Sequence, residues 1–244
     1  MTAIYKRELK SYFKSPIGYI FLGAFMFFAS LMFVFINLMG QTASMTGFFQ
    51  NISMIFVFVI PILTMKTMSE ERKSKTDQLL LTAPVKVTDI IVGKFFAAAT
   101  VLLIGFLAII CYVLILKLYG SPQIGEIMVG FLGLFLMGLL YVSIGIFMSS
   151  ITESQVIAAV TTFGILFFIW FISLIGLSFS SAITGAFSWV GTILDWCVNF
   201  ISVNTRFYDF TIGTLNFVPI FYFLSLTVLF NFLSVQVVEK RRFK

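Results

Sequence analysis

Stretches of about 20 predominantly apolar residues, the length that one helical membrane span requires, recur along this chain of 244 residues. The mean hydropathy is +1.07, and only 11% of the residues are charged, which is far outside the composition of soluble proteins. The sequence therefore predicts an all-α polytopic membrane protein with about six transmembrane helices. The apolar windows are 17–38, 49–65, 95–116, 127–148, 156–177 and 217–235.

The basic residues mark the ends of these windows and fall on alternate sides. Of the 16 lysines and arginines, all except Lys117 and Arg206 lie before the first window, between the second and third, or after the sixth. The positive-inside rule therefore predicts that both termini are cytoplasmic. Basic residues clustered at span ends favour contacts with anionic membrane lipids, and we expect no nucleic-acid partner.

The longest polar stretch, residues 66–94, forms the predicted cytoplasmic loop between the second and third spans and reads KTMSEERKSKTDQLLLTAPVKVTDIIVGK. Its middle carries three leucines that are soon followed by Pro84, a residue that ends helices. This pattern predicts a short amphipathic helix on the membrane face, where a soluble partner can push. A solvated charged connector is the alternative.

Two other segments have amphipathic patterns. Residues 5–14 place aromatic residues and leucine on one helical face and lysines on another, before Ser15-Pro16, which predicts an interfacial helix. The alternative is a frayed polar tail. Residues 178–216, before the sixth span, alternate apolar and polar positions at helical spacing, which predicts an external amphipathic or re-entrant segment. A short hydrophobic helix packed on the outer ends of the spans fits the same pattern.

The chain lacks the residue types of most catalytic sites. It has no histidine, which excludes imidazole acid–base chemistry and histidine-ligated metals. Glu126, Glu153 and Glu239 lie at span ends, whereas a carboxylate at mid-membrane would indicate ion coupling. Cys111 and Cys197 fall in the third span and in the external segment, so we expect no disulfide. We predict no catalytic, cofactor-binding or metal site in this chain.

Several motifs, taken in order, resemble the permease subunit of type-2 ABC exporters, especially the gliding-motility-type permeases. They are YKRELKSYFKSP at 5–16, EERK at 70–73, TDQLLLTAPV at 76–85, GKF at 93–95 and EKRR at 239–242. The resemblance covers residues 1–244 as a single permease domain and implies a subunit of the bacterial plasma (inner) membrane. In that family an N-terminal elbow helix and the loop between spans two and three contact a cytoplasmic ABC ATPase.

The resemblance also implies partners and functional residues. The chain would pair with a second copy or a paralogue and bind two ATPase subunits, and an extracytoplasmic accessory protein would fit the same arrangement. ATP and Mg would be held by the ATPase, because this chain has no G-x-x-x-x-G-K-[ST] phosphate loop. Carried over by position, the ATPase-coupling residues are Glu70, Glu71, Arg72, Thr76, Asp77, Leu79, Leu80 and Pro84.

By the same resemblance, the second and fifth spans would line a translocation path or a dimer seam. A wall of phenylalanine and methionine suits an amphipathic cargo better than a small ion, although aromatic residues of membrane helices also face lipid. The candidate path or seam residues are Met54, Phe56, Phe58, Phe163, Phe167, Trp170 and Phe171.

The function that follows is that of a permease subunit, which couples ATP hydrolysis by a separate ATPase to movement of an amphipathic cargo. The chain itself would not be an enzyme. A non-transporting membrane anchor, or a mechanotransmission subunit driven by an ABC ATPase, is the alternative. A membrane-embedded enzyme ranks last, because the chain lacks convergent acids, bases and metal ligands.

Overall fold

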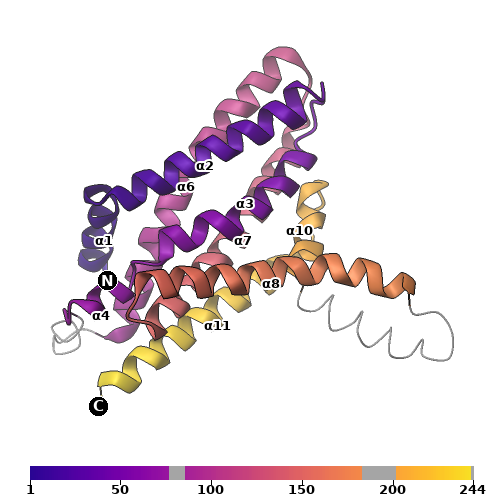
Figure 1. The fold of residues 1–244 in the computed structure, drawn as a ribbon. Helices are drawn as coiled ribbons and strands as arrows, with labels where there is room; N and C mark the ends of the chain where they lie inside the picture. Colours follow the sequence, from indigo (N-terminus) through magenta and orange to yellow (C-terminus); the bar gives the residue numbers. More distant parts are fainter. Residues whose placement is uncertain (77–85, 183–201, 243–244) are drawn as a thin grey trace.

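The structure, a computed structural model, describes residues 1–76, 86–182 and 202–242 (Figure 1). For residues 173–182 and 242 it describes the backbone only. Every regular element in these ranges is a helix. The elements are α1 (Thr2–Lys14), α2 (Pro16–Phe33), the π-helical turn η1 (Val34–Leu38), α3 (Thr46–Thr64), α4 (Ser69–Lys73), α6 (Val87–Tyr119), α7 (Ile124–Ile151), α8 (Gln155–Ala182), α10 (Val203–Thr211) and α11 (Phe217–Arg242).

Six helical stretches in the described residues are long and apolar enough to cross a membrane. They agree with the six predicted windows, so the all-α polytopic fold class is confirmed. The spans are Pro16–Leu38, Thr46–Lys73, Val87–Tyr119, Ile124–Ile151, Gln155–Ile172 and Phe217–Arg241.

The predicted N-terminal helix is present as α1, and the sequence explains its end. Ser15 has an extended backbone, with φ −92° and ψ 156°, and Pro16 occupies the first position of α2. Proline is favoured there because the first helical N–H has no intrahelical partner. The chain therefore turns sharply between α1 and the first span. That α1 lies in the membrane interface stays a prediction.

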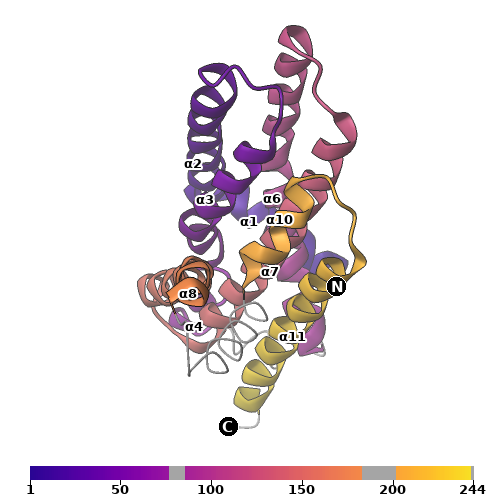
Figure 2. The same ribbon diagram turned by 90° about the vertical axis from the view of Figure 1, so that its right-hand side faces the viewer.

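Helix α7 is the centre of the bundle and packs against α3, α6, α8, α10 and α11 (Figure 2). Its glycines allow the close approach of α3. A Cβ atom at Gly145 would lie 2.1 Å from Thr64 Oγ1, and one at Gly130 would lie 2.5 Å from Phe49 Cε2. Small residues of this kind allow close helix packing in membranes. In the most apolar window of α7, 72% of the residues are buried.

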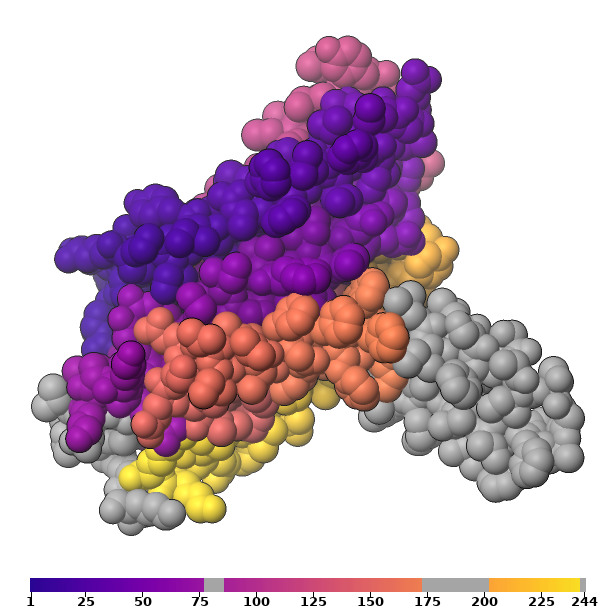
Figure 3. Space-filling view, viewed as in Figure 1, coloured from indigo at the N-terminus to yellow at the C-terminus, as the bar shows by residue number. Residues whose placement is uncertain are grey.

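Helix α8 lies at the periphery, where its described part is spread over one face of the molecule beside α3 (Figure 3). Only 17% of its span window is buried. The exposed side chains include Val156, Val160 and Phe168. The described part of this helix therefore has an exposed apolar surface.

Helix α1, helix α4 and the C-terminal end of α11 gather at one end of the bundle, at the left of Figure 1. We call this the α1 end. Helix α10 lies toward the opposite end. The predicted loop 66–94 contains α4 and the first residues of α6, and the predicted external segment 178–216 contains α10. Residues 77–85 and 183–201 lie outside the described residues.

Candidate functional site

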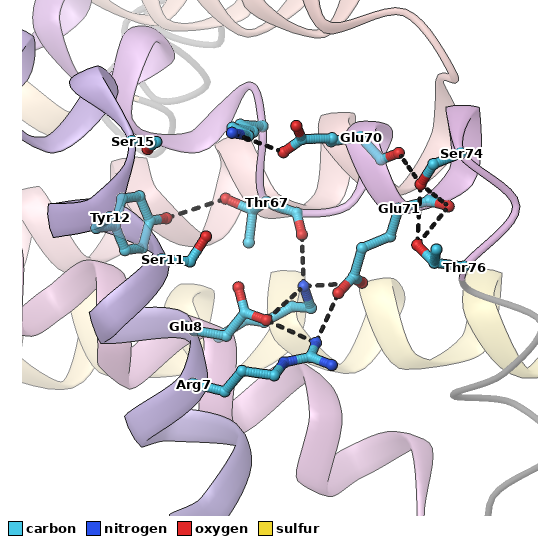
Figure 4. Close-up of a pocket in the computed structure, with 12 residues that line it drawn as sticks. Arg7, Glu8, Ser11, Tyr12, Ser15, Thr67, Glu70, Glu71, Ser74 and Thr76 are labelled. Carbon is cyan, nitrogen blue, oxygen red and sulfur yellow. Dashed lines mark hydrogen bonds and ion pairs between the residues drawn. The ribbon is translucent and has the colours of Figure 1, made fainter.

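Four charged side chains from three helices meet at the α1 end. This charged cluster consists of Arg7 and Glu8 from α1, Glu71 from α4 and Lys94 from α6. Lys94 Nζ lies 2.9 Å from Glu71 Oε2 and 3.3 Å from Glu8 Oε1. Arg7 Nη2 lies 2.7 Å from Glu71 and 2.8 Å from Glu8, so each carboxylate bridges both cations (Figure 4).

Lys94 is the most deeply buried member, with 1% of its side chain exposed. Its ammonium group has three N–H donors, and the third is donated to the carbonyl oxygen of Thr67 at 2.7 Å. Two positive and two negative charges balance one another. That balance matters because a buried charge is tolerated only when it is paired and hydrogen-bonded.

Arg7 is half exposed, and two effects oppose each other at its guanidinium. Burial lowers the pKa of Arg7, but the hydrogen bonds and charges of Glu8 and Glu71 raise it by more. The net pKa lies above the ordinary value. Arg7 is therefore a permanent cation at the rim of the cluster.

The GKF motif at 93–95 lies where α6 packs against α1. A Cβ atom at Gly93 would lie 3.1 Å from Ile4 Cγ2, so glycine leaves room for α1 against α6. Glu8 follows Ile4 by four residues and therefore lies on the same face of α1, next to Lys94. Tyr5 shares a hydrogen bond of 3.0 Å with the Thr100 hydroxyl on α6.

Tyr12 joins α1 to the C-terminal end of α3 by hydrogen bonds. Its buried phenol donates to the carbonyl oxygen of Leu63 at 3.3 Å and shares a hydrogen bond of 3.2 Å with the hydroxyl of Thr67. Burial raises the pKa of the Tyr12 phenol well above its ordinary value. The side chain is therefore a neutral hydroxyl that joins α1 to the segment leading into α4.

A second set of contacts joins α4 to the C-terminal end of α7. Arg72 pairs with Glu153 at 2.8 Å and donates to the carbonyl oxygen of Ile151. Arg241, from α11, donates to the carbonyl oxygens of Ser150 and Ile151. The last carbonyls of a helix have no intrahelical partners and carry partial negative charge, so two arginines stabilise this end of α7.

Ser149 completes this junction with its side chain. Its buried hydroxyl oxygen accepts hydrogen bonds from the backbone N–H groups of Met68 at 3.0 Å and Ser69 at 3.1 Å. The same hydroxyl donates to the carbonyl oxygen of Met65 at 3.2 Å. These are the backbone groups of the turn between α3 and α4. One side chain of α7 therefore satisfies much of that turn.

A cavity of about 340 Å³ opens beside the charged cluster. Figure 4 shows Ser11 and Tyr12 on one side of this cavity and Thr67, Glu70 and Glu71 on the other. In the described ranges no three histidine, cysteine, aspartate or glutamate side chains gather in a way that could hold a metal ion. The full lining is Arg7, Glu8, Ser11, Tyr12, Ser15, Lys66, Thr67, Glu70, Glu71, Ser74, Thr76 and Lys94.

Some predicted coupling residues belong to these contacts. Glu71 and Arg72 form ion pairs within the chain, and Glu70 pairs with Lys66 at 2.9 Å. Thr76 is exposed and donates to the carbonyl oxygen of Glu71 at 3.3 Å. The remaining predicted coupling residues, Asp77, Leu79, Leu80 and Pro84, lie outside the described residues.

Sequence reasoning missed the partners of Glu71 and Arg72. Glu8, Glu153 and Lys94 are distant in sequence and meet only in the folded chain. One available signal was the position of Lys94, which is followed by apolar residues and preceded by Ile90, Ile91 and Val92. A lysine inside an apolar helical pattern indicates a buried cation with a partner.

The predicted path or seam residues divide into two groups. The Phe58 and Phe163 rings pack at the α3–α8 face with centroids 5.1 Å apart and planes tilted by 45°, and the Phe167 ring stacks on Phe163 at 5.6 Å. Met54 and Phe171 are also exposed, and Trp170 is partly buried with its ring 6.1 Å from that of Phe167. Phe56 differs, because it is fully buried in the core against Phe25 and Phe106 and does not reach this face.

One comparison with known proteins decides the family. The family model of the ABC-2 family transporter proteins matches residues 2–243, almost the whole chain. The chain belongs to the ABC-2 transporter family. No curated protein is similar enough to it to count as a match. Family membership makes the chain an ABC permease, a membrane subunit that is not itself catalytic and that pairs with a cytoplasmic ABC ATPase.

Proposed function

We propose that this permease couples ATP hydrolysis by its partner ATPase to movement of an amphipathic cargo across or out of the bacterial inner membrane, as a permease of the gliding-motility type. The observation that carries the proposal is the position of α4. Residues 77–85, which hold the leucines of the predicted ATPase-coupling set, follow α4 closely. Helix α4 is ion-paired to α1, to α6 and to the turn between α7 and α8. A push on that loop would therefore reach the spans through α4.

The contacts of α4 favour transmission of a displacement. Glu71 connects α4 to α1 and α6, and Arg72 connects it to the turn between α7 and α8. The Glu71–Lys94 pair is largely buried and costly to break, so it favours joint movement of α4 and α6. The Arg72–Glu153 pair is weaker, because 66% of the Glu153 side chain is exposed. Closure of the ATPase subunits would then tilt several spans at once and shift the permease between two packings. Glu71 and Arg72 would act inside the chain, while Leu79 and Leu80 would fill a groove on the ATPase.

The apolar α3–α8 face supports the second part of the proposal. Two copies of the chain, or one copy and a paralogue, would meet near this face around a path, with one ATPase on each. Its exposed phenylalanine and methionine side chains suit an amphipathic cargo. The mass of the purified complex tests the assembly, and full ATP-dependent activity from one permease with one ATPase would overturn it.

The coupling proposal is tested with the double variant Leu79→Asp/Leu80→Asp. Two carboxylates forced into an apolar groove would cost several kcal/mol of binding, on the order of the penalty for burying unpaired charge. We expect loss of ATPase co-purification and of cargo-stimulated ATP hydrolysis, with membrane insertion intact because the loop lies outside the apolar windows. Both quantities are measured at matched expression.

Lys73→Asp is the matched control, because it changes the net charge by the same amount at an exposed position on α4, before residues 77–85. If the ATPase still binds the double variant, residues 77–85 are not the coupling element. The wild-type complex also tests the alternative. If the ATPase binds the wild-type chain but no cargo stimulates its ATP hydrolysis, the result would favour the mechanotransmission alternative.

The proposed topology, with both termini and loop 66–94 in the cytoplasm, has its own test. Single cysteines are introduced as Lys75→Cys, Lys244→Cys and Ser121→Cys in a chain whose Cys111 and Cys197 are replaced by serine. In intact cells an impermeant thiol reagent should label the Ser121→Cys variant alone, because the positive-inside rule puts the other two positions inside. Labelling of Lys75→Cys would reverse the orientation.

A further inference from the structure

A second cavity, of about 410 Å³, lies beside the first and is lined differently. It shares Arg7, Ser11, Ser15 and Lys66 with the first cavity, but no carboxylate lines it. Its volume is in the range of ligand-binding clefts. We call it the basic cavity, and its full lining is Arg7, Lys10, Ser11, Lys14, Ser15 and Lys66.

The cations of the basic cavity are only partly neutralised by the protein. Arg7 pairs with Glu8 and Glu71, and Lys66 pairs with Glu70. Lys10 and Lys14 form no ion pair with any described residue. They are four residues apart on α1, where like charges on adjacent turns repel. The cavity therefore has an excess of positive charge that an anion would relieve.

The position of the cavity identifies the kind of anion. Lys14 and Ser15 directly precede α2, and Lys66 lies two residues after the end of α3, so the cavity lies where one apolar helix begins and another ends. Where apolar helices cross a membrane, this is the expected level of lipid headgroups, at which lysines and aromatic residues gather. Just beyond it on α2, Tyr19 and Ile20 are exposed, and the Tyr19 ring packs edge-on against Phe13 at 5.9 Å.

We propose that the basic cavity binds the phosphate headgroup of an anionic phospholipid. The lysines and Arg7 would neutralise the phosphate, the serine hydroxyls would donate hydrogen bonds to its oxygens, and the acyl chains would lie on the exposed apolar surface of α2. The apolar surface next to the cavity favours a lipid over free phosphate. Because Arg7 lines the cavity and belongs to the charged cluster, bound lipid would lie against the helix that the cluster holds. This inference does not depend on the proposed coupling to ATP hydrolysis.

The experiment measures displacement of a fluorescent phosphatidylglycerol from the purified full-length chain in neutral detergent. Unlabelled phosphatidylglycerol should displace the probe saturably, whereas phosphatidylcholine and inorganic phosphate at the same concentration should not. In Lys10→Gln/Lys14→Gln the affinity should fall about tenfold or more, since each basic residue near an anionic surface contributes a factor of about five. The variant Lys10→Arg/Lys14→Arg, which keeps both charges, should bind like the wild type.

The matched control is Lys6→Gln/Lys73→Gln, which removes the same charge from exposed positions at the α1 end that do not line the cavity. Its affinity should stay near that of the wild type. Equal weakening in both glutamine variants would reduce the effect to net charge and overturn the site. Displacement by inorganic phosphate as effective as by the lipid would overturn the lipid assignment, and binding that never saturates would overturn both.

Discussion

The two ends of the helical bundle are held together by different chemistry. Every ion pair between described residues lies at the α1 end. At the opposite end the polar contacts between described residues are hydrogen bonds and a cation–π contact, in which Arg206 lies 5.2 Å from the centre of the Tyr222 ring. Asn37 donates to the carbonyl oxygens of Thr42 at 3.1 Å and Ser44 at 2.9 Å, and Glu126 accepts from the hydroxyls of Ser44 and Thr46.

The comparison shows where the bundle is sensitive to the loss of one group. Removing one member of a buried ion pair leaves an uncompensated charge, which costs about 3–5 kcal/mol. A typical neutral hydrogen bond contributes only about 0.5–1.5 kcal/mol, and a hydrogen bond to a charged group such as Glu126 about 1.5–3 kcal/mol. The α1 end is therefore the end where the positions of helices are tightly fixed to one another. The polar contacts at the opposite end cost less to break.

The largest effect is expected from Lys94→Met, which has similar volume and no charge. Glu8 and Glu71 would then share only the half-exposed Arg7, and the free energy of unfolding should fall by about 3–5 kcal/mol. Denaturant unfolding in detergent measures the change. The double variant Lys94→Met/Glu71→Gln should recover part of the loss, because it leaves one carboxylate, Glu8, for the one remaining cation, Arg7. A single variant as stable as the wild type would show that the cluster does not hold the helices.

An intermediate effect is expected from Ser149→Ala. The backbone N–H groups of Met68 and Ser69 would lose their acceptor in a buried place, which costs about 1–3 kcal/mol. The control is Ser143→Ala on the same helix, because Ser143 is equally buried but donates only to the Leu140 carbonyl of its own helix. Similar losses of stability in both variants would mean that α7 does not specifically support the α3–α4 turn.

The spans could be predicted because their signal is local in the sequence. The contacts between helices at the α1 end could not be predicted, because they join residues that are distant in the sequence. Each span is one continuous apolar run, and Ser15-Pro16 marks the boundary between α1 and the first span in both the sequence and the structure. The charged cluster joins residues separated by up to 86 positions. Sequence reasoning treated Lys94 as a loop residue because the apolar window starts at Phe95, but the helix begins earlier, at Val87. Glu71 is among the predicted coupling residues, but its partners depend on how α1 packs against α6.

The smallest effect is expected at the opposite end, from Glu126→Gln. The amide oxygen of glutamine can still accept from the hydroxyls of Ser44 and Thr46, so only the charge-assisted part of those bonds is lost. We expect a loss of less than about 1 kcal/mol in the free energy of unfolding, measured under the same conditions as Lys94→Met. If the two variants cost the same, the charge at Glu126 is as important as the buried cluster. The two ends would then be equally constrained. A displacement of α4 would in that case not separate the helices more easily at the opposite end than at the α1 end.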